Sequence, residues 1–353
     1  MTVTGSPQLA GMRAAVLPDR LLRQWTDDEM ANYLTGIAGA GLDTVITKLD
    51  AVDDRFAAQC REFGLAPVGA MPCFNAARPA TADVDHLRPV DERGHEFEQM
   101  EWYNGLIPTD TAYADALAAR CAELAASAPV DGVVLDFIRW PLHWELELRP
   151  GTSPRRSSFD RTTLTRFAEY LDEVGHAGHG IEPRNPTRSA TIIDGGFLTR
   201  WTQFRCAVIT DLTARLATAI HSRGQWAGAY LVPGDMAARV TVGQDTAALG
   251  KVLDVMLPMT YHAILHRTPS WPASVVADIR TTTTASLVPV LQVTSDSAYA
   301  GRADWGAPIS TRALSAAVEA VASIGQGGFA LFPGHALTQE RRDAVRHTLT
   351  TDG

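Results

Sequence analysis

The chain has 353 residues, 46% of them hydrophobic, and a formal net charge of −9 at pH 7. Because it is acidic and carries no basic run, nucleic acid and anionic membrane are disfavoured as partners. No apolar run reaches membrane-spanning length, and the N-terminus lacks a basic segment followed by an apolar one. We therefore expect a cytoplasmic protein.

Short apolar strands alternate with helical segments along the whole chain. Eight strands are expected, over residues 12–17, 43–50, 66–75, 131–140, 225–232, 254–261, 287–293 and 328–332. Helices are expected over residues 27–40, 53–63, 110–127, 158–174, 197–222, 242–249, 272–283, 311–324 and 338–350. Such alternation predicts a parallel sheet, and eight units close into an α/β fold of the (β/α)8 (TIM barrel) type. A doubly wound open sheet is disfavoured, since no GxGxxG turn follows the first strand.

The sequence contains no second core and no linker, so we expect one catalytic domain over residues 1–353. Two long loops follow the third and fourth strands, over residues 76–108 and 141–195, and the second carries a helix-bearing insertion. Long loops in a compact domain usually carry function. Both are expected on the rim formed by the carboxyl ends of the strands.

The fourth strand, within residues 130–141 (VDGVVLDFIRWP), organises this rim. Its apolar run, VVL, is typical of a parallel strand buried on both faces. The run ends on Asp136, followed by Arg139 and Trp140. A carboxylate at the end of a buried strand is unfavourable unless that end opens into a polar cleft. Since function in parallel α/β folds sits at the carboxyl ends of the strands, Asp136 is the first candidate catalytic residue.

Polar and aromatic side chains follow the other strands as well. The candidate substrate-binding residues are Lys48, Asn75, Glu101, Trp102, Arg139, Trp140, Asp235, Tyr261, His262 and Gln292. Sugars need this mixture, because aromatic faces pack on the ring and paired polar groups bind the hydroxyls. His262 is either a substrate ligand or proton shuttle, or simply a histidine satisfied at the rim.

Metal and cofactor chemistries lack their usual residues. No HxH pair with further ligands is present for a two-metal hydrolase, and no glycine-rich phosphate grip lies near the last two strands. The four cysteines form no CxxC pair, so buried free thiols are expected instead of a zinc site. Lys48 could form a Schiff base, but pairing with Asp50 or a substrate oxygen is favoured. We expect no metal and no cofactor.

Hydrolysis of a glycosidic bond requires two carboxyl groups, one charged and one protonated. Asp136 is the natural first member. Its partner is ambiguous at this level, and the alternatives are Asp296, Asp235, Glu101, Glu145 and Asp50. Asp296 and Asp50 are taken as the candidates, with Asp50 the better placed at the end of the second strand. Each of these residues taken singly is also a plausible helix cap or solvated loop acid.

The fourth-strand motif resembles that of glycoside-hydrolase-like barrel families, whose fourth strand reads D-G-(apolar)3-D-[FYD]-x-R-[FYW]-P. The similarity extends to the segment WYN at residues 102–104 and to FLTRWTQFR at residues 197–205. Weaker similarities are TKLD at residues 47–50 and PMTYH at residues 258–262. The resemblance implies a barrel enzyme that acts on carbohydrate.

Chitinase-like enzymes are more distantly similar, with D-G-x-D-x-D-x-E on the fourth strand and M-x-Y-D on the sixth. Here Val134 replaces the middle acid, Ile138 replaces the catalytic Glu, and His262 replaces the Asp of the sixth strand. Without a Glu at position 138 the substrate-assisted mechanism of that family has no general acid. The chitinase assignment is therefore rejected.

Together these features predict a glycoside hydrolase or transglycosidase that acts on an oligosaccharide or small glycoside through a carboxylate pair including Asp136. Two alternatives stay open: a sugar-processing lyase, isomerase or aldolase, and a carbohydrate-binding pseudo-enzyme. The expected partner is a carbohydrate substrate. The oligomeric state is open, and a homo-oligomer is one option.

Overall fold

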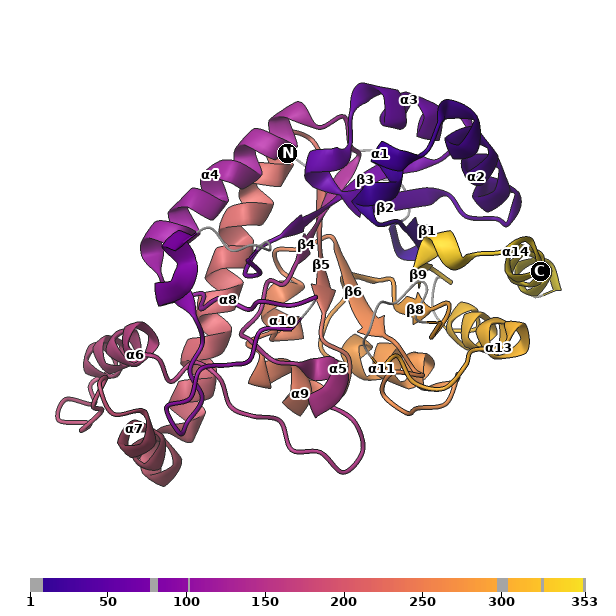
Figure 1. Cartoon of the computed structure of the whole chain (residues 1–353). Coiled ribbons are helices and arrows are strands. Elements are labelled where there is room, and N and C mark those ends of the chain that lie inside the picture. Colours follow the sequence, from indigo (N-terminus) through magenta and orange to yellow (C-terminus); the bar gives the residue numbers. More distant parts are fainter. Residues whose placement is uncertain (1–8, 77–81, 101, 297–303, 325–326, 352–353) are drawn as a thin grey trace.

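The protein is described from a computed structural model that covers residues 9–76, 82–100, 102–296, 304–324 and 327–351 (Figure 1). Its parallel strands are β1 (Arg13–Val16), β2 (Thr44–Lys48), β3 (Ala66–Pro72), β4 (Gly132–Asp136), β5 (Trp226–Leu231), β6 (Val255–Thr260), β7 (Ser286–Leu287), β8 (Val290–Gln292) and β9 (Phe329–Phe332). Each strand from β1 to β6 pairs with the next, and β9 pairs with both β8 and β1, which closes the sheet.

The β7 and β8 segments are two parts of one strand, because both pair with β6. Pro289 lies between them, and a proline has no amide hydrogen to donate to the ladder. The barrel thus has eight strands, and the predicted (β/α)8 fold is confirmed.

Helices cover the outside of this barrel (Figure 1). They are α1 (Asp19–Gln24), α2 (Asp27–Gly39), α3 (Asp54–Glu62), α4 (Thr111–Ser127), α5 (Trp144–Glu147), α6 (Arg161–Glu173), α7 (Pro186–Ile192), α8 (Leu198–His221), α9 (Met236–Thr241), α10 (Thr246–Leu249), α11 (Trp271–Arg280), α13 (Thr311–Ala322) and α14 (Gln339–Thr351). None of the helices within these residues is both long and apolar enough to cross a membrane.

Local sequence signals explain many helix starts. Thr26 and Glu29 form a reciprocal capping box at the start of α2, and Asp110 caps α4 through the amide of Tyr113. One helix was expected over residues 242–249, whereas the chain forms both α9 and α10. Asp235 and Asp245 explain the difference, because each caps its own helix start.

Two layers of buried apolar side chains hold the barrel together. The interior layer comes from inward-facing positions of the strands and includes Ile46, Val134 and Ala330. Side chains alternate along a strand, so the residue two positions further on points to the same side. Asp136 follows Val134 by two positions, and Phe332 follows Ala330 in the same way. Both therefore point into the carboxyl-terminal mouth of the barrel.

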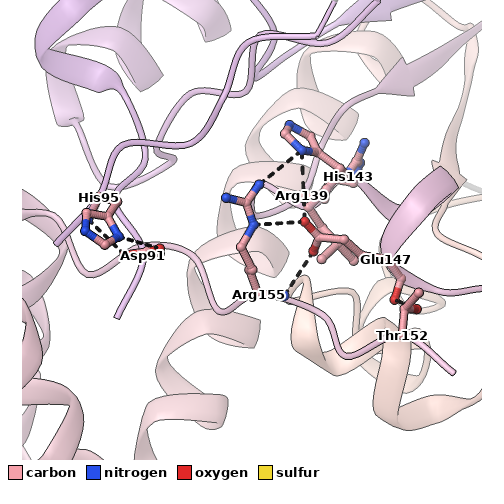
Figure 2. A network of polar contacts seen from close by, with 8 residues as sticks. Asp91, His95, Arg139, His143, Glu147, Thr152 and Arg155 are labelled. Atoms are coloured by element: carbon pink, nitrogen blue, oxygen red, sulfur yellow. Dashed lines mark hydrogen bonds and ion pairs between the residues drawn. The ribbon is translucent and has the colours of Figure 1, made fainter. Parts of the chain in front are cut away.

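The connections after β3 and β4 cover this mouth and contact each other. Arg155, in the connection after β4, bonds the Glu147 carboxylate through its amide (3.1 Å) and its guanidinium (3.3 Å) (Figure 2). The same guanidinium lies over the ring of Phe97, in the connection after β3, at 4.7 Å. In addition, the amide of Phe159 donates to the carbonyl of Val90 (2.9 Å). The two long connections therefore form one packed rim.

Candidate active site

A cavity of about 840 Å³ opens at the carboxyl ends of the strands. Strand ends contribute Lys48, Asp136, Tyr230, Tyr261 and Phe332 to its lining. The connections after β3 and β4 contribute Asn75, Trp102, Trp144 and Glu145, and the connection after β8 contributes Trp305. The volume lies within the range usual for small-molecule sites. Asp136 and Phe137 of the fourth-strand motif thus line a cavity of ligand size.

Asp136 is held in the cavity wall by its own turn. The chain turns sharply after β4, because Phe137 adopts a positive φ of 53°. In this turn the amide of Phe137 donates to Oδ1 of Asp136 (2.8 Å). Removal from water raises the pKa of Asp136 to about 6, against smaller opposing effects of this amide and of Arg139.

Arg139 is buried beneath this turn. Its guanidinium lies 4.6 Å from the ring centre of Tyr103, which stacks on Phe137, and its Nη1 donates to the carbonyl of Leu142 (2.8 Å). Its positive charge lowers the pKa values of Asp136 and Glu145. Arg139 is thus a buried cation whose charge acts on both acids of the site.

Glu145 is the second carboxyl group that burial perturbs in this cavity. It lies in α5, is 8% exposed, and accepts a hydrogen bond from the Trp102 side chain. Burial raises its pKa to about 7, and the charge of Asp136 contributes to the rise, while Arg139 and Trp102 oppose it. Its Oε2 atom has no protein partner among the described residues. The carboxyl group is therefore bonded by Trp102, while its Oε2 atom is buried without a protein partner.

The sequence named Glu145 only as one of five alternatives, since α5 lies in an excursion with little periodicity. Its one local signal is the run HWEL, in which the acid adjoins an aromatic residue three positions after Pro141. That signal does not set the orientation of the Glu145 side chain. The orientation depends on Trp102, which belongs to the other long connection and bonds the carboxyl group.

An aromatic wall closes one side of the cavity. We use this term for Trp144, Tyr261, Trp305 and Phe332. The Tyr261 ring stacks on Phe332 at 5.3 Å, and lies 5.6 Å from Trp144 and 6.1 Å from Trp305. Flat aromatic surfaces of this kind pack on the C–H faces of sugar rings.

Two cations line another side. Lys48 and Arg120 both pair with Oδ2 of Asp50, at 3.1 and 3.4 Å. Lys48 and Arg120 line the cavity, whereas Asp50 lines a neighbouring surface depression of about 230 Å³. The pairing of Lys48 with Asp50 agrees with the sequence-based expectation. Asp50 itself does not line the cavity that holds Asp136.

Several other predicted residues satisfy backbone groups. Oδ1 of Asn75 accepts from the amide of Asn104 (2.7 Å) at the edge of the cavity. Asp235 caps α9 through the amide of Ala238 (2.9 Å). Gln292 is fully buried and bonds the backbone of residues 263, 264, 294 and 305, so it supports the loops that carry Tyr261 and Trp305.

The remaining candidates lie apart from the cavity or outside the described residues. Trp140 is buried in the core, where its indole donates to the carbonyl of Arg205 (2.9 Å). His262 is 3% exposed, and burial lowers its pKa to about 4, so its ring is neutral near pH 7. Asp296 is exposed at the rim, beyond the end of β8. Glu101 lies outside the described residues.

No group of three or more His, Cys, Asp or Glu side chains in the described part of the chain is arranged to hold a metal ion. The cysteines are free, and burial raises the pKa of the Cys60, Cys121 and Cys206 thiols to between about 11 and about 12. The reactive groups that line the cavity are therefore carboxyl, hydroxyl, amide and ammonium groups.

Neither the protein-family models nor the curated proteins contain a match to this sequence. Solved structures do match its fold. The glycoside hydrolase domain of PgaB (BpsB) from Bordetella bronchiseptica is 15% identical with a TM-score of 0.68, and the match covers 96% of this chain and 98% of that one.

Two further neighbours belong to other enzymes. A class V chitinase from Pseudomonas fluorescens Pf-5 is 12% identical with a TM-score of 0.55, and the match covers 96% of this chain and 99% of that one. A β-galactosidase from the psychrophilic Marinomonas ef1 is 10% identical with a TM-score of 0.69 over 97% of this chain, which spans only 59% of that enzyme. At these identities the likeness concerns the fold. The chain shares the barrel architecture of these glycoside hydrolases.

Proposed function

We propose that this protein hydrolyses, or transfers, a glycosidic bond in a small glycoside or oligosaccharide. One observation carries the proposal: two buried carboxyl groups with raised pKa values, about 6 for Asp136 and about 7 for Glu145, line the same aromatic cavity. Paired acids whose environments separate their pKa values are the requirement of this reaction. The fold shared with known glycoside hydrolases supports the same conclusion.

The causes of the two pKa shifts assign the roles. Burial and the charge of Asp136 both raise the pKa of Glu145, so Glu145 is the general acid that protonates the glycosidic oxygen. The amide of Phe137 and the charge of Arg139 both favour the ionised form of Asp136, which is assigned to the anomeric carbon. It attacks that carbon in a retaining enzyme, or removes a proton from the attacking water in an inverting one. In the retaining case Glu145, now deprotonated, activates the water that releases the sugar.

The other residues orient the sugar and the acids. Arg139 keeps Asp136 partly ionised, because its charge favours the carboxylate. The aromatic wall packs on the sugar ring, and Lys48 donates to its hydroxyls. A volume of about 840 Å³ favours a short glycoside or the end of an oligosaccharide.

The test is hydrolysis across a panel of 4-nitrophenyl glycosides and oligosaccharides with wild type, Asp136→Asn and Glu145→Gln. We expect both variants to stay folded and to lose at least about 10²-fold in kcat. Azide should restore activity to one of them on an activated aryl glycoside, since a small anion can replace a missing carboxylate.

Matched controls are Asp50→Asn and Asp296→Asn, which remove the two partners considered from the sequence. Each should keep activity within about tenfold of wild type. Loss of activity in either control with a fully active Glu145→Gln would transfer the acid–base role away from Glu145. Hydrolysis of no glycoside by wild type would refute the proposed function.

A further inference from the structure

Tyr230, on β5, occupies the position beside Asp136. The β4–β5 register pairs Val134 with Gly228 and Leu135 with Ala229. The next pair in this register is Asp136, the last residue of β4, and Tyr230, the last but one of β5. Adjacent strands lie about 4.8 Å apart, and paired positions of parallel strands face the same side. Both side chains accordingly line the cavity.

The Tyr230 hydroxyl is buried without a protein partner. The residue is 6% exposed, and its Oη has no hydrogen-bond partner among the described residues. Buried tyrosine hydroxyls usually find a partner, because an unbonded one destabilises the fold. Tyr230 lines the cavity, and a ligand oxygen that reaches its hydroxyl would supply the missing partner.

Gln244 ties the backbone at Tyr230 to the turn that follows Asp136. Its side-chain amide donates to the carbonyls of Tyr230 (3.0 Å) and Ile138 (3.3 Å), and its Oε1 accepts from the amide of Val232 (2.8 Å). One fully buried side chain thus joins the end of β5 to the turn after β4. The backbone positions that carry the phenol and the carboxylate are therefore linked before any ligand binds.

We propose that Tyr230 is a catalytic residue, whose hydroxyl donates a hydrogen bond to the oxygen on carbon 2 of the sugar that Asp136 faces. The inference rests on the proposed function and names its substrate class, glycosides of sugars with a free 2-hydroxyl. Burial, and secondly the charge of Asp136, raise the pKa of Tyr230, so the phenol keeps its proton and can donate it in a hydrogen bond to an acceptor oxygen.

The chemistry of the reaction selects this oxygen. Besides the glycosidic oxygen, the oxygens nearest the anomeric carbon are the ring oxygen and the one on carbon 2. In the oxocarbenium-like transition state positive charge develops on the ring oxygen, which makes it a poor acceptor. The oxygen on carbon 2 stays an acceptor, and hydrogen bonds to it strengthen in the transition state. A hydrogen-bond donor beside the attacking carboxylate therefore stabilises the transition state most when it bonds the oxygen on carbon 2.

Tyr230→Phe removes only the hydroxyl. We expect kcat/KM on the best aryl glycoside to fall about 10²-fold, as when one preorganised donor is removed. The melting temperature should not fall, because the hydroxyl bonds nothing in the protein. Tyr33→Phe is the matched control: its hydroxyl is likewise buried without a hydrogen bond, but it lies on α2 outside the barrel. It should leave the kinetics unchanged.

The decisive comparison uses the 4-nitrophenyl glycoside that wild type cleaves best and its 2-deoxy analogue. The ratio of kcat/KM between wild type and Tyr230→Phe should be about 100 on the parent and about 1 on the analogue. An equal ratio on both substrates, an unimpaired Tyr230→Phe, or a wild type that cleaves only 2-acetamido sugars would overturn the inference but leave the proposed function intact. A wild type inactive on all glycosides would overturn both.

Discussion

Replacing Glu145 by glutamine tests whether the acid at the centre of the site destabilises the fold. Burial raises its pKa from an ordinary 4.5 to about 7. Each pKa unit corresponds to about 1.4 kcal/mol, so keeping this group ionised in the folded state costs about 3 kcal/mol. Glutamine carries no charge at any pH and retains an oxygen that can accept from Trp102.

The direction of the stability change with pH follows from the pKa of Glu145 in the unfolded and in the folded protein. Below pH 4.5 the carboxyl group is protonated in both states, and its burial has no ionisation cost. As the pH rises to about 7, only the unfolded chain ionises, so the free energy of unfolding of wild type falls. Above that pH the loss is complete. The stability of Glu145→Gln relative to wild type should therefore increase by about 3 kcal/mol across this window.

Thermal melts of both proteins near pH 4.5 and near pH 8.5 measure this difference. With about 2.1 cal/mol/K of unfolding entropy per residue and 353 residues, 3 kcal/mol corresponds to about 4 °C in Tm. Any pH-independent change in the free energy of unfolding caused by the new amide is the same at both pH values, so it cancels when the two differences are compared. Asp235→Asn is the control, since asparagine also caps helices. A Tm difference between Glu145→Gln and wild type that is equal at both pH values would refute the reasoning.

Three further predictions concern the site. The pH profile of kcat/KM should be bell-shaped with limbs near 6 and 7, because Asp136 must be ionised while its partner carboxyl stays protonated; a flat profile between pH 5 and 8 would contradict it. Arg139→Met should move the acid limb to higher pH, since the guanidinium lowers the pKa of Asp136; an unmoved limb would show that the charge is screened. Gly306→Ala should lower the free energy of unfolding by about 1–3 kcal/mol, because φ of Gly306 is +83° and the added Cβ would lie 2.0 Å from the carbonyl oxygen of Ala263. It should also raise KM, because the neighbouring Trp305 belongs to the aromatic wall. Denaturant unfolding measures the first effect and steady-state kinetics the second.

Residue types and their periodicity were enough to predict the barrel and the strand end on which the site is built. The run VVL followed by Asp136 predicted a parallel strand with a polar end, and eight alternating units predicted closure of the sheet, which the structure confirms. Closure then brings strand-end residues such as Lys48, Asp136 and Tyr261 around one cavity. These inferences hold because strand direction and side-chain alternation are local properties of the chain.

Local signals could not decide which loop side chains face the cavity. Trp140 follows the strand directly but packs in the core, whereas Trp305, far along the chain, forms part of the aromatic wall. Trp102 and Glu145 meet from two different long connections. Each orientation depends on partners many residues away, and nothing in the neighbouring sequence specifies those partners.

The same limit separates the candidate acids. Asp50, at a strand end, turns toward Arg120 on α4, and Asp235 is used by a helix start. Glu145, on a four-residue helix without periodicity, is the acid that burial leaves in the cavity. The sequence by itself determined the barrel and one carboxylate at its mouth. Only the tertiary structure brought Glu145 into the same cavity, because burial and charge proximity, which set a carboxyl pKa, arise from contacts between distant segments.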